Sequence, residues 1–309
     1  MKNPSRVLLV VLVLATLILP GCQPKEKEAA DLLEKVTNRG TLIIATDPAY
    51  PPASQLVEGV TRPKDTKCAA DQRVAAEFVG FDIDTAVEVA RRLGVEACFV
   101  TPDWTLITGG NWSDRWDISI GSMTITAERM DKLYFTFPYY VGIEAFYVHK
   151  DSPVQSIEEL SGKKIGACSG CTYEYYLDKT LAVPGLDIDF LVDNPQFVGY
   201  DTDVPALQDL ALGDGVRLDA VMTGMNIGDE SIVSGLPLRR LEPTITYSFN
   251  GGAVDKAFGV NPVPLVKKVG EIILAMHQDG TLKRYSMDRF GYDCVTDAAI
   301  FDLDALEQW

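Results

Sequence analysis

The segment 121–129 combines small residues, hydroxyl groups and a single arginine at the end of an apolar run. The residues before it (117–120) predict a short buried strand, and those around Arg129 predict the start of a helix. Backbone amides at a strand end, threonine hydroxyls and a guanidinium together suit a small carboxylate. A planar guanidinium pairs with a carboxylate through two parallel hydrogen bonds. The alternative interpretation is a surface arginine beside a capped helix.

The N-terminus has the pattern of a secretory signal. Residues 1–21 contain two basic side chains, an apolar run over residues 7–19 and small residues before a break at Cys22, and the run is too short for a spanning helix. The sequence Leu-Pro-Gly-Cys resembles a bacterial lipobox, which implies cleavage before Cys22 and lipid attachment to it. The proline is less typical of that motif, so secretion with a free Cys22 is the alternative.

This N-terminus predicts an extracytoplasmic protein. With Cys22 lipidated, residues 22–40 would form the lipid anchor and a polar tether, because buried acyl chains hold a protein at a membrane surface. The folded part would then lie at the outer face of the cytoplasmic membrane, or in the periplasm. No second stretch of the sequence is long and apolar enough to cross a bilayer.

The charge balance excludes two kinds of partner. The net charge is −16 at pH 7. A strongly acidic chain repels the phosphates of nucleic acid and the headgroups of anionic lipids. The charge does not identify a ligand.

The six cysteines predict disulfides rather than a metal or a catalytic thiol. Cys168 and Cys171 have the spacing of a redox or metal pair, but no second cysteine or histidine pair has zinc spacing. No histidine is placed in sequence to activate a thiol. In an exported protein a local disulfide between these two is the better interpretation. Cys68 and Cys98 could form a second disulfide, leaving Cys294 unpaired, although sequence does not fix the connectivity.

Strand-like and helix-like segments alternate along the chain, which is the pattern of an α/β protein with an open sheet. The roughly 270 residues that follow the signal and tether predict two domains. A polar loop over residues 51–79 is longer than ordinary connections. The predicted strands are 41–46, 95–100, 117–120, 145–148, 164–167 and 219–222, and the predicted helices are 81–93, 172–179, 204–212 and 264–278.

Several short motifs in order along the chain resemble the extracellular solute-binding proteins, family 3, of polar amino-acid ABC transporters. The resemblance runs from about residue 40 to residue 293. The matching motifs are LIIATD at 42–47, VGFDID at 79–84, the segment 117–129, FPYY at 137–140, IEELSGKKIG at 157–166 and DGTL at 279–282.

The resemblance implies a two-lobed, type II periplasmic-binding-protein (Venus-flytrap) fold with two crossover hinge strands, near residues 140–144 and 249–253. Lobe 1 would comprise residues 41–141 plus 252–295, lobe 2 residues 142–251, and a C-terminal tail residues 296–309. It further implies a monomer without cofactor or metal. The lobes would close on a small-molecule ligand, an amino acid or related carboxylate, and the closed form would dock on the permease subunits of an ABC transporter.

The same resemblance assigns roles to site residues. Tyr50 and Trp104 match positions where aromatic side chains pack on the ligand, although Trp104 could be ordinary core. Ser122 and Thr124 match positions that hydrogen-bond the ligand, and Arg129 matches the carboxylate-binding arginine. Thr172 matches a ligand contact in lobe 2, with a simple helix N-cap as the alternative.

One position departs from the family pattern. Just after the strand predicted over residues 219–222, many family members carry an aspartate that binds the α-ammonium group of the ligand. In this sequence that position is Gly224. An unpaired ammonium in a closed cleft is costly, so either another acid replaces it or the ligand is not an ordinary α-amino acid. The candidates are Asp47, which is best placed by the resemblance, Glu144, Asp229 and Glu230.

Two other functions stay open alongside a non-enzymatic binding protein. Relatives with the same fold resemble cyclohexadienyl or arogenate dehydratases, which need a general acid in the cleft. Glu144 is the acid that we would nominate for that role. The third hypothesis is a ligand-sensing module whose closure is transmitted to a signalling partner instead of a permease.

Overall fold

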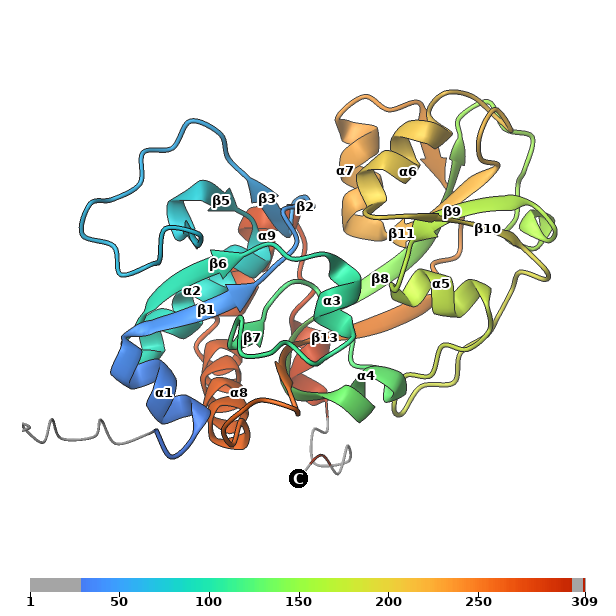
Figure 1. Cartoon of the computed structure of the whole chain (residues 1–309). Coiled ribbons are helices and arrows are strands. Elements are labelled where there is room, and N and C mark those ends of the chain that lie inside the picture. Colours follow the sequence, from blue (N-terminus) through green and yellow to red (C-terminus); the bar gives the residue numbers. More distant parts are fainter. Residues whose placement is uncertain (1–28, 302–307, 309) are drawn as a thin grey trace, which may run out of the picture.

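Two α/β lobes lie side by side and are joined by two long strands (Figure 1). This computed structural model describes residues 29–301 and residue 308. The predicted signal and Cys22 lie outside the described residues. The fold class predicted from the sequence is confirmed.

Lobe 1 is built on parallel strands whose buried side chains pack against helices. Strand β1 pairs with β6 on one side and β7 on the other, both parallel. Helices α2 and α8 each supply more buried apolar side chains to its larger core cluster than any other element, and α9 adds Leu282. The elements are β1 (Thr41–Ala45), β4 (Arg73–Val74), β6 (Glu96–Val100), β7 (Ile118–Ser119), α2 (Phe81–Leu93), α8 (Val263–Gln278) and α9 (Thr281–Phe290).

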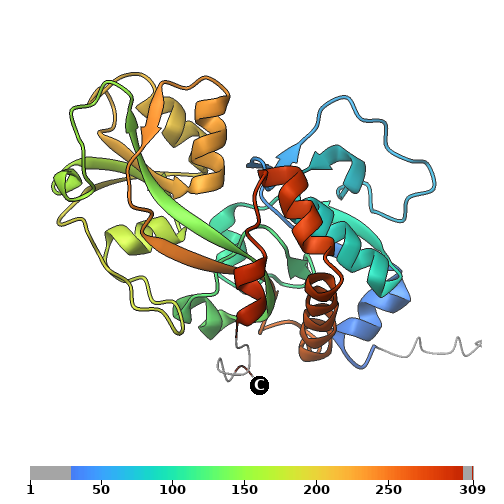
Figure 2. The ribbon, with the colours of Figure 1, turned by 180° about the vertical axis from the view of Figure 1, so that it is seen from behind.

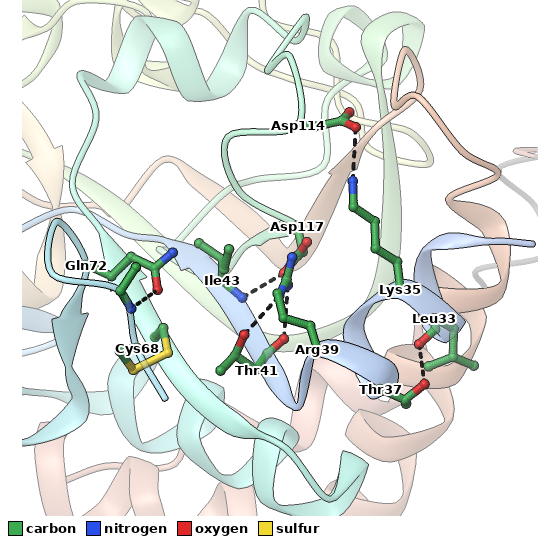
Figure 3. Close-up of polar contacts among 12 residues, drawn as sticks. Leu33, Lys35, Thr37, Arg39, Thr41, Ile43, Cys68, Gln72, Asp114 and Asp117 are labelled. Carbon is green, nitrogen blue, oxygen red and sulfur yellow. Dashed lines mark hydrogen bonds and ion pairs between the residues drawn. A yellow bond between two sulfur atoms is a disulfide. The ribbon is translucent and has the colours of Figure 1, made fainter. Parts of the chain in front are cut away.

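Helix α1 (Leu32–Arg39) corrects the predicted tether over residues 22–40, because this helix belongs to the folded lobe. Leu32 and Val36, one turn apart, are fully buried in the lobe 1 core. Arg39 at its end bonds to the Thr41 carbonyl and pairs with the buried Asp117 carboxylate (Figure 3). Its short length and charged neighbours concealed this amphipathic helix in the sequence.

Lobe 2 has the same plan around a smaller sheet. Strand β9 pairs in parallel with β10 and with β11. Its strands and helices are β9 (Lys164–Cys168), β10 (Gln196–Tyr200), β11 (Ala220–Gly224), β12 (Leu238–Arg240), α5 (Thr172–Leu177), α6 (Asp203–Leu210) and α7 (Met225–Val233). A short 3₁₀ helix, η2 (Glu158–Leu160), precedes β9.

Strands β8 (Leu133–His149) and β13 (Thr246–Asp255) pair antiparallel and run through both lobes. They join the two halves into one sheet of order β10-β9-β11-β8-β13-β7-β1-β6-β4, with β12 on β8. The strand predicted over residues 145–148 is therefore only the end of a much longer one. Its Gly142 and Pro138 interrupt the β-branched pattern that would have shown its length.

The long polar loop of lobe 1 contains short elements of its own. Strands β2 (Ala49–Tyr50), β3 (Ser54–Leu56) and β5 (Phe78–Val79) form a small sheet, and η1 (Ala75–Glu77) precedes β5. The rest projects from the lobe (Figures 1 and 2). Arg62 donates to the carbonyls of Gln72, Ala69 and Cys68, and a disulfide joins Cys68 to Cys98 of β6. The loop is thus held at its centre and at its base.

The C-terminal segment packs on the crossover strands. The 3₁₀ helix η3 (Thr296–Ile300) buries Ala298, and the Phe301 ring lies 4.7 Å from that of Phe249 on β13. Gln308 donates to the Phe135 carbonyl of β8. The described part of the predicted tail is therefore attached to lobe 1. Within the residues that the structure describes, we find no helix with the length and apolarity needed to cross a membrane.

Candidate functional site

A pocket lies between the lobes, and all eight residues proposed from the sequence as ligand contacts line it. The space between its lining atoms, including the part open to solvent, is about 540 Å³. The eight residues come from both lobes and from β8. They are Asp47, Tyr50, Trp104, Ser122, Thr124, Arg129, Glu144 and Thr172.

Arg129 lies on α4 (Ala127–Lys132) with its guanidinium in the pocket. Its Nη1 donates to the Thr124 carbonyl and its Nη2 to the Gly170 carbonyl, each at 3.0 Å, while its Nε has no partner. The residue is 2% exposed, and burial lowers the pKa of the guanidinium. A buried cation with a free N–H is a site for an anionic acceptor.

The loop before α4 is held rigidly. Ser122 has a left-handed backbone (φ 54°), which costs energy for a non-glycine residue. Its amide donates to the Tyr139 hydroxyl, and its Oγ donates to Asp82 and accepts from the Tyr140 hydroxyl. Asp82 is fully buried, and burial raises the pKa of its carboxyl to about 6. This network fixes the pocket edge formed by Ser122 and Thr124.

The lobes contact each other across the pocket. Trp104, on α3 (Trp104–Thr108), donates its Nε1 to the Gly170 carbonyl at 3.2 Å, and its ring lies 5.5 Å from the Arg129 guanidinium carbon. Gly170 thus accepts from two lobe 1 side chains. The hydroxyls of Tyr50 in lobe 1 and Tyr173 in lobe 2, which also line the pocket, lie 3.2 Å apart. The arrangement therefore corresponds to a closed cleft.

Three carboxyl groups line the same pocket as this single guanidinium. Glu144 and Asp203 are each 3% exposed, and burial raises the pKa of Glu144 to about 8 and that of Asp203 to about 7. Asp47 also lines the pocket, and burial raises the pKa of its carboxyl. Among the described residues that line the pocket, Arg129 is the one with a basic side chain. The site thus combines one anion-binding group with an excess of acids.

Two of the four acids nominated from the sequence are elsewhere. Asp229 accepts from the Tyr147 hydroxyl and pairs with Arg240, and Glu230 is exposed. Neither lines the pocket. Both follow Gly224 on α7, a helix whose turn directs these side chains away from the cleft. The interpretation that either acid replaces the usual aspartate is therefore wrong for this arrangement.

Asp203, Tyr173 and Asn226 line the pocket but were missed from the sequence. Asp203 is the first residue of α6 and accepts from the Thr223 hydroxyl at 2.5 Å. The Asp-Val pattern at a helix start looks like an ordinary polar helix terminus. A comparison of the buried and exposed sides of α6 would have been the signal, since Asp203 shares its buried side with Ala206, Leu207 and Leu210.

Comparison with known proteins agrees with this geometry. The profile of the "Bacterial extracellular solute-binding proteins, family 3" matches residues 67–291. The chain belongs to this family.

Family relatives with curated names bind amino acids. The L-cystine-binding protein TcyJ of Escherichia coli (strain K12) is 29% identical over 291 residues, 91% of this chain and 94% of that protein. The lysine/arginine/ornithine-binding periplasmic protein of the same strain is 26% identical over 300 residues, which cover 92% of this chain and 98% of that protein. An ancestral amino acid-binding protein, AncCDT-1, described as a precursor of cyclohexadienyl dehydratase, superimposes with a TM-score of 0.65 at 25% identity, covering 84% of this chain and 100% of that one.

The departure from the family at Gly224 has a steric counterpart. A Cβ atom on Gly224 would lie 2.3 Å from the Tyr50 hydroxyl and 2.6 Å from Oδ1 of Asn226. The Gly224 amide donates to the Tyr173 hydroxyl at 3.0 Å. Tyrosine and asparagine side chains therefore fill the space that an aspartate at this position would need.

A second disulfide forms part of the pocket wall. Cys168 and Cys171 are bonded and both line the pocket, and Gly170 between them accepts the bonds from Arg129 and Trp104. Cys294 is buried and free. Across residues 29–301 and 308, no group of three or more His, Cys, Asp or Glu side chains is arranged to hold a metal ion.

Proposed function

We propose that this protein is the solute receptor of an ABC importer and binds an amino acid or related small carboxylate between its lobes. The observation that carries the proposal is the unpartnered Nε of a buried arginine in an interlobe pocket. Family membership and the names of the relatives support both the solute class and the transporter.

The carboxylate would accept from Arg129 Nε, which has no partner, whereas each Nη already donates one of its two N–H groups to a carbonyl. Ser122, Thr124 and Thr172 would add polar contacts from the two sides of the pocket, and Trp104 and Tyr50 would enclose the remainder. Since these groups come from both lobes, a bound solute would favour the closed form by its differential contacts. That closed form would be recognised by the permease subunits.

The binding test compares two arginine variants. Arg129→Ala should abolish solute-induced thermal stabilisation by each of the twenty standard amino acids, L-ornithine and L-cystine, because removing a buried charge-assisted partner costs on the order of 2–5 kcal/mol. Arg284→Ala, on the exposed side of α9, is the matched control and should behave like the unmodified protein. An amino acid at 100 times its Kd should stabilise the unmodified protein by about 2.7 kcal/mol. Unchanged binding by Arg129→Ala would refute the site.

Location and assembly form a separate part of the proposal. Lipidation of Cys22 would anchor a monomeric receptor at the outer face of the cytoplasmic membrane. The full-length protein should partition with membranes, and Cys22→Ser should move it to the soluble extracytoplasmic fraction without changing solute affinity. Equal partitioning of both forms would contradict lipid anchoring. Light scattering of the soluble form should give the mass of one chain.

A dehydratase activity is the second candidate, and one observation favours it. Glu144 is buried in the pocket with a pKa raised to about 8, so it is protonated at neutral pH and could donate a proton. The comparison with AncCDT-1 is with an amino acid-binding protein, which favours binding. Turnover of prephenate or arogenate by the purified protein would replace the binding proposal with this one.

A further inference from the structure

Glu144 lies directly across the sheet from Gly224. Strands β11 and β8 pair antiparallel, with Gly224 opposite Glu144 and Thr223 opposite Ala145. Directly opposed residues of an antiparallel pair project their side chains on the same face, with Cβ atoms about 5 Å apart. A carboxylate on β8 at this position therefore reaches the same part of the pocket as a side chain on residue 224 would.

The two oxygens of Glu144 are in different situations. Oε1 accepts from the hydroxyls of Ser248 and, at 3.5 Å, Thr172, whereas Oε2 is buried without a partner. The residue is 3% exposed and lines the pocket. A buried carboxylate oxygen without a donor is costly. One oxygen is thus fixed in position and the other is available to a donor that enters the pocket.

The neighbouring charges distinguish Glu144 from the other two pocket acids. Glu144 and Arg129 line the same pocket and interact electrostatically with each other. Asp203 interacts with Asp47, and both Asp203 and Glu144 interact with Tyr50. In an α-amino acid the ammonium and the carboxylate are attached to the same carbon atom. The anion that binds the ammonium must therefore be close to Arg129, and among the three pocket acids it is Glu144 that acts electrostatically on Arg129.

We infer that Oε2 of Glu144 binds the α-ammonium group of the solute whose carboxylate binds Arg129. The inference rests on the proposed function. It makes Glu144 the residue that selects α-amino acids over the corresponding α-hydroxy acids. The carboxylate that binds the ammonium is then on β8, directly opposite Gly224, where the neighbouring side chains leave no room for an aspartate.

Proton uptake and release follow from the burial of Glu144. The titratable groups that face it are the Arg129 guanidinium and the hydroxyls of Tyr50 and Tyr173. Burial raises the pKa of Glu144 to about 8. At pH 7 the carboxyl is therefore protonated in the empty pocket, and pairing with an ammonium ionises it. Binding of an amino acid at pH 7 should release a proton from Glu144 to the buffer.

The test uses Glu144→Gln, which keeps the shape and removes the charge. The strongest binder among the standard amino acids, L-ornithine and L-cystine is compared with its own α-hydroxy acid by calorimetry. The unmodified protein should prefer the amino acid, and Glu144→Gln should weaken amino-acid binding about 30-fold or more while leaving the α-hydroxy acid unaffected. Asp209→Asn, an α6 residue outside the pocket that pairs with Arg217, is the control and should retain the preference.

A second readout separates recognition from structure. Calorimetry at pH 7 in buffers of different ionisation enthalpy should show proton release by the unmodified protein, and the part due to Glu144, up to about one proton, should be lost in Glu144→Gln. Equal amino-acid affinity and equal proton release in Glu144→Gln would overturn the inference and leave the proposed function standing. Failure of the unmodified protein to bind any of these amino acids would refute the proposed function itself, and the inference with it.

Discussion

The stability of the empty protein should fall as pH rises through neutrality. Burial raises the pKa of Glu144 from 4.5 to about 8 and that of Asp203 from 3.8 to about 7. Because each pKa is higher in the folded state, the stability that these carboxyls contribute is complete below about pH 4 and is lost as pH rises through their folded pKa values. As the pH rises, a protonated buried carboxyl must either lose its proton and become a buried charge or become exposed to solvent, and both destabilise the folded state.

The size of the effect follows from the same values. Between pH 6.5 and 7.5 both carboxyls are ionised in the unfolded chain. In the folded protein Glu144 stays mostly protonated, and Asp203 passes from mostly protonated to mostly ionised. Each proton retained by the folded state lowers the free energy of unfolding by about 1.4 kcal/mol per pH unit. The two groups together should therefore lower it by on the order of 2 kcal/mol over this interval.

The assay is urea denaturation of protein stripped of solute by unfolding, dialysis and refolding, at pH 6.5, 7.0 and 7.5. His277 has the opposite sign, since burial lowers its pKa below 6.5, and its contribution is a small rise at the acid end of this interval, where the unfolded imidazole titrates. Glu144→Gln should remove more than half of the slope. Asp209→Asn is the control, because Arg217 holds the pKa of Asp209 below its usual range, far outside this interval.

Two results would refute this reasoning. One is a free energy of unfolding that is constant or rises between pH 6.5 and 7.5. The other is an identical slope in the unmodified protein and in Glu144→Gln. Either result would mean that Glu144 is ionised in the empty pocket and would remove the basis for proton release on binding.

Two further predictions concern stability. Gly228→Ala in α7 should lower the free energy of unfolding by about 1–3 kcal/mol, because its Cβ would lie 2.1 Å from the Tyr147 ring. Gly270→Ala in α8, whose Cβ would have its nearest neighbour at 3.4 Å, is the control and should be neutral or stabilising. Paired urea titrations measure both changes. Replacing both Cys68 and Cys98 by alanine should destabilise the protein by about 3–4 kcal/mol, because their disulfide closes a loop of 30 residues. Unchanged thermal unfolding would contradict that estimate.

The sequence predicted local elements well where termination signals bounded an amphipathic segment. Helix α2 spans Phe81–Leu93 as predicted, because Gly94 ends it in a left-handed conformation and apolar residues repeat at helical spacing before it. Helix α1 was missed because its buried face consists of two side chains, Leu32 and Val36, within a charged segment. In sequence, two apolar residues among charged ones look the same as a polar linker. Only the position of the lobe 1 core shows that they are buried.

Pocket residues that lie within a single sequence motif could be predicted. Residues such as Ser122 and Arg129 lie in one segment, whose strand-end position brings hydroxyls and a guanidinium together. Glu144 could be named as a candidate acid, but its position opposite Gly224 depends on a register between strands that are far apart in sequence. Asp203 reaches the pocket only through the packing of α6. Relations of this kind are set by tertiary structure and not by local pattern.

The most direct test of the account is an experimental structure of the protein with its strongest amino-acid binder. We predict a closed cleft in which a carboxylate oxygen of the amino acid lies within hydrogen-bond distance of Arg129 Nε, with its ammonium beside Oε2 of Glu144. An amino acid that lies in the pocket without contacting Arg129, or that binds outside the pocket, would contradict it.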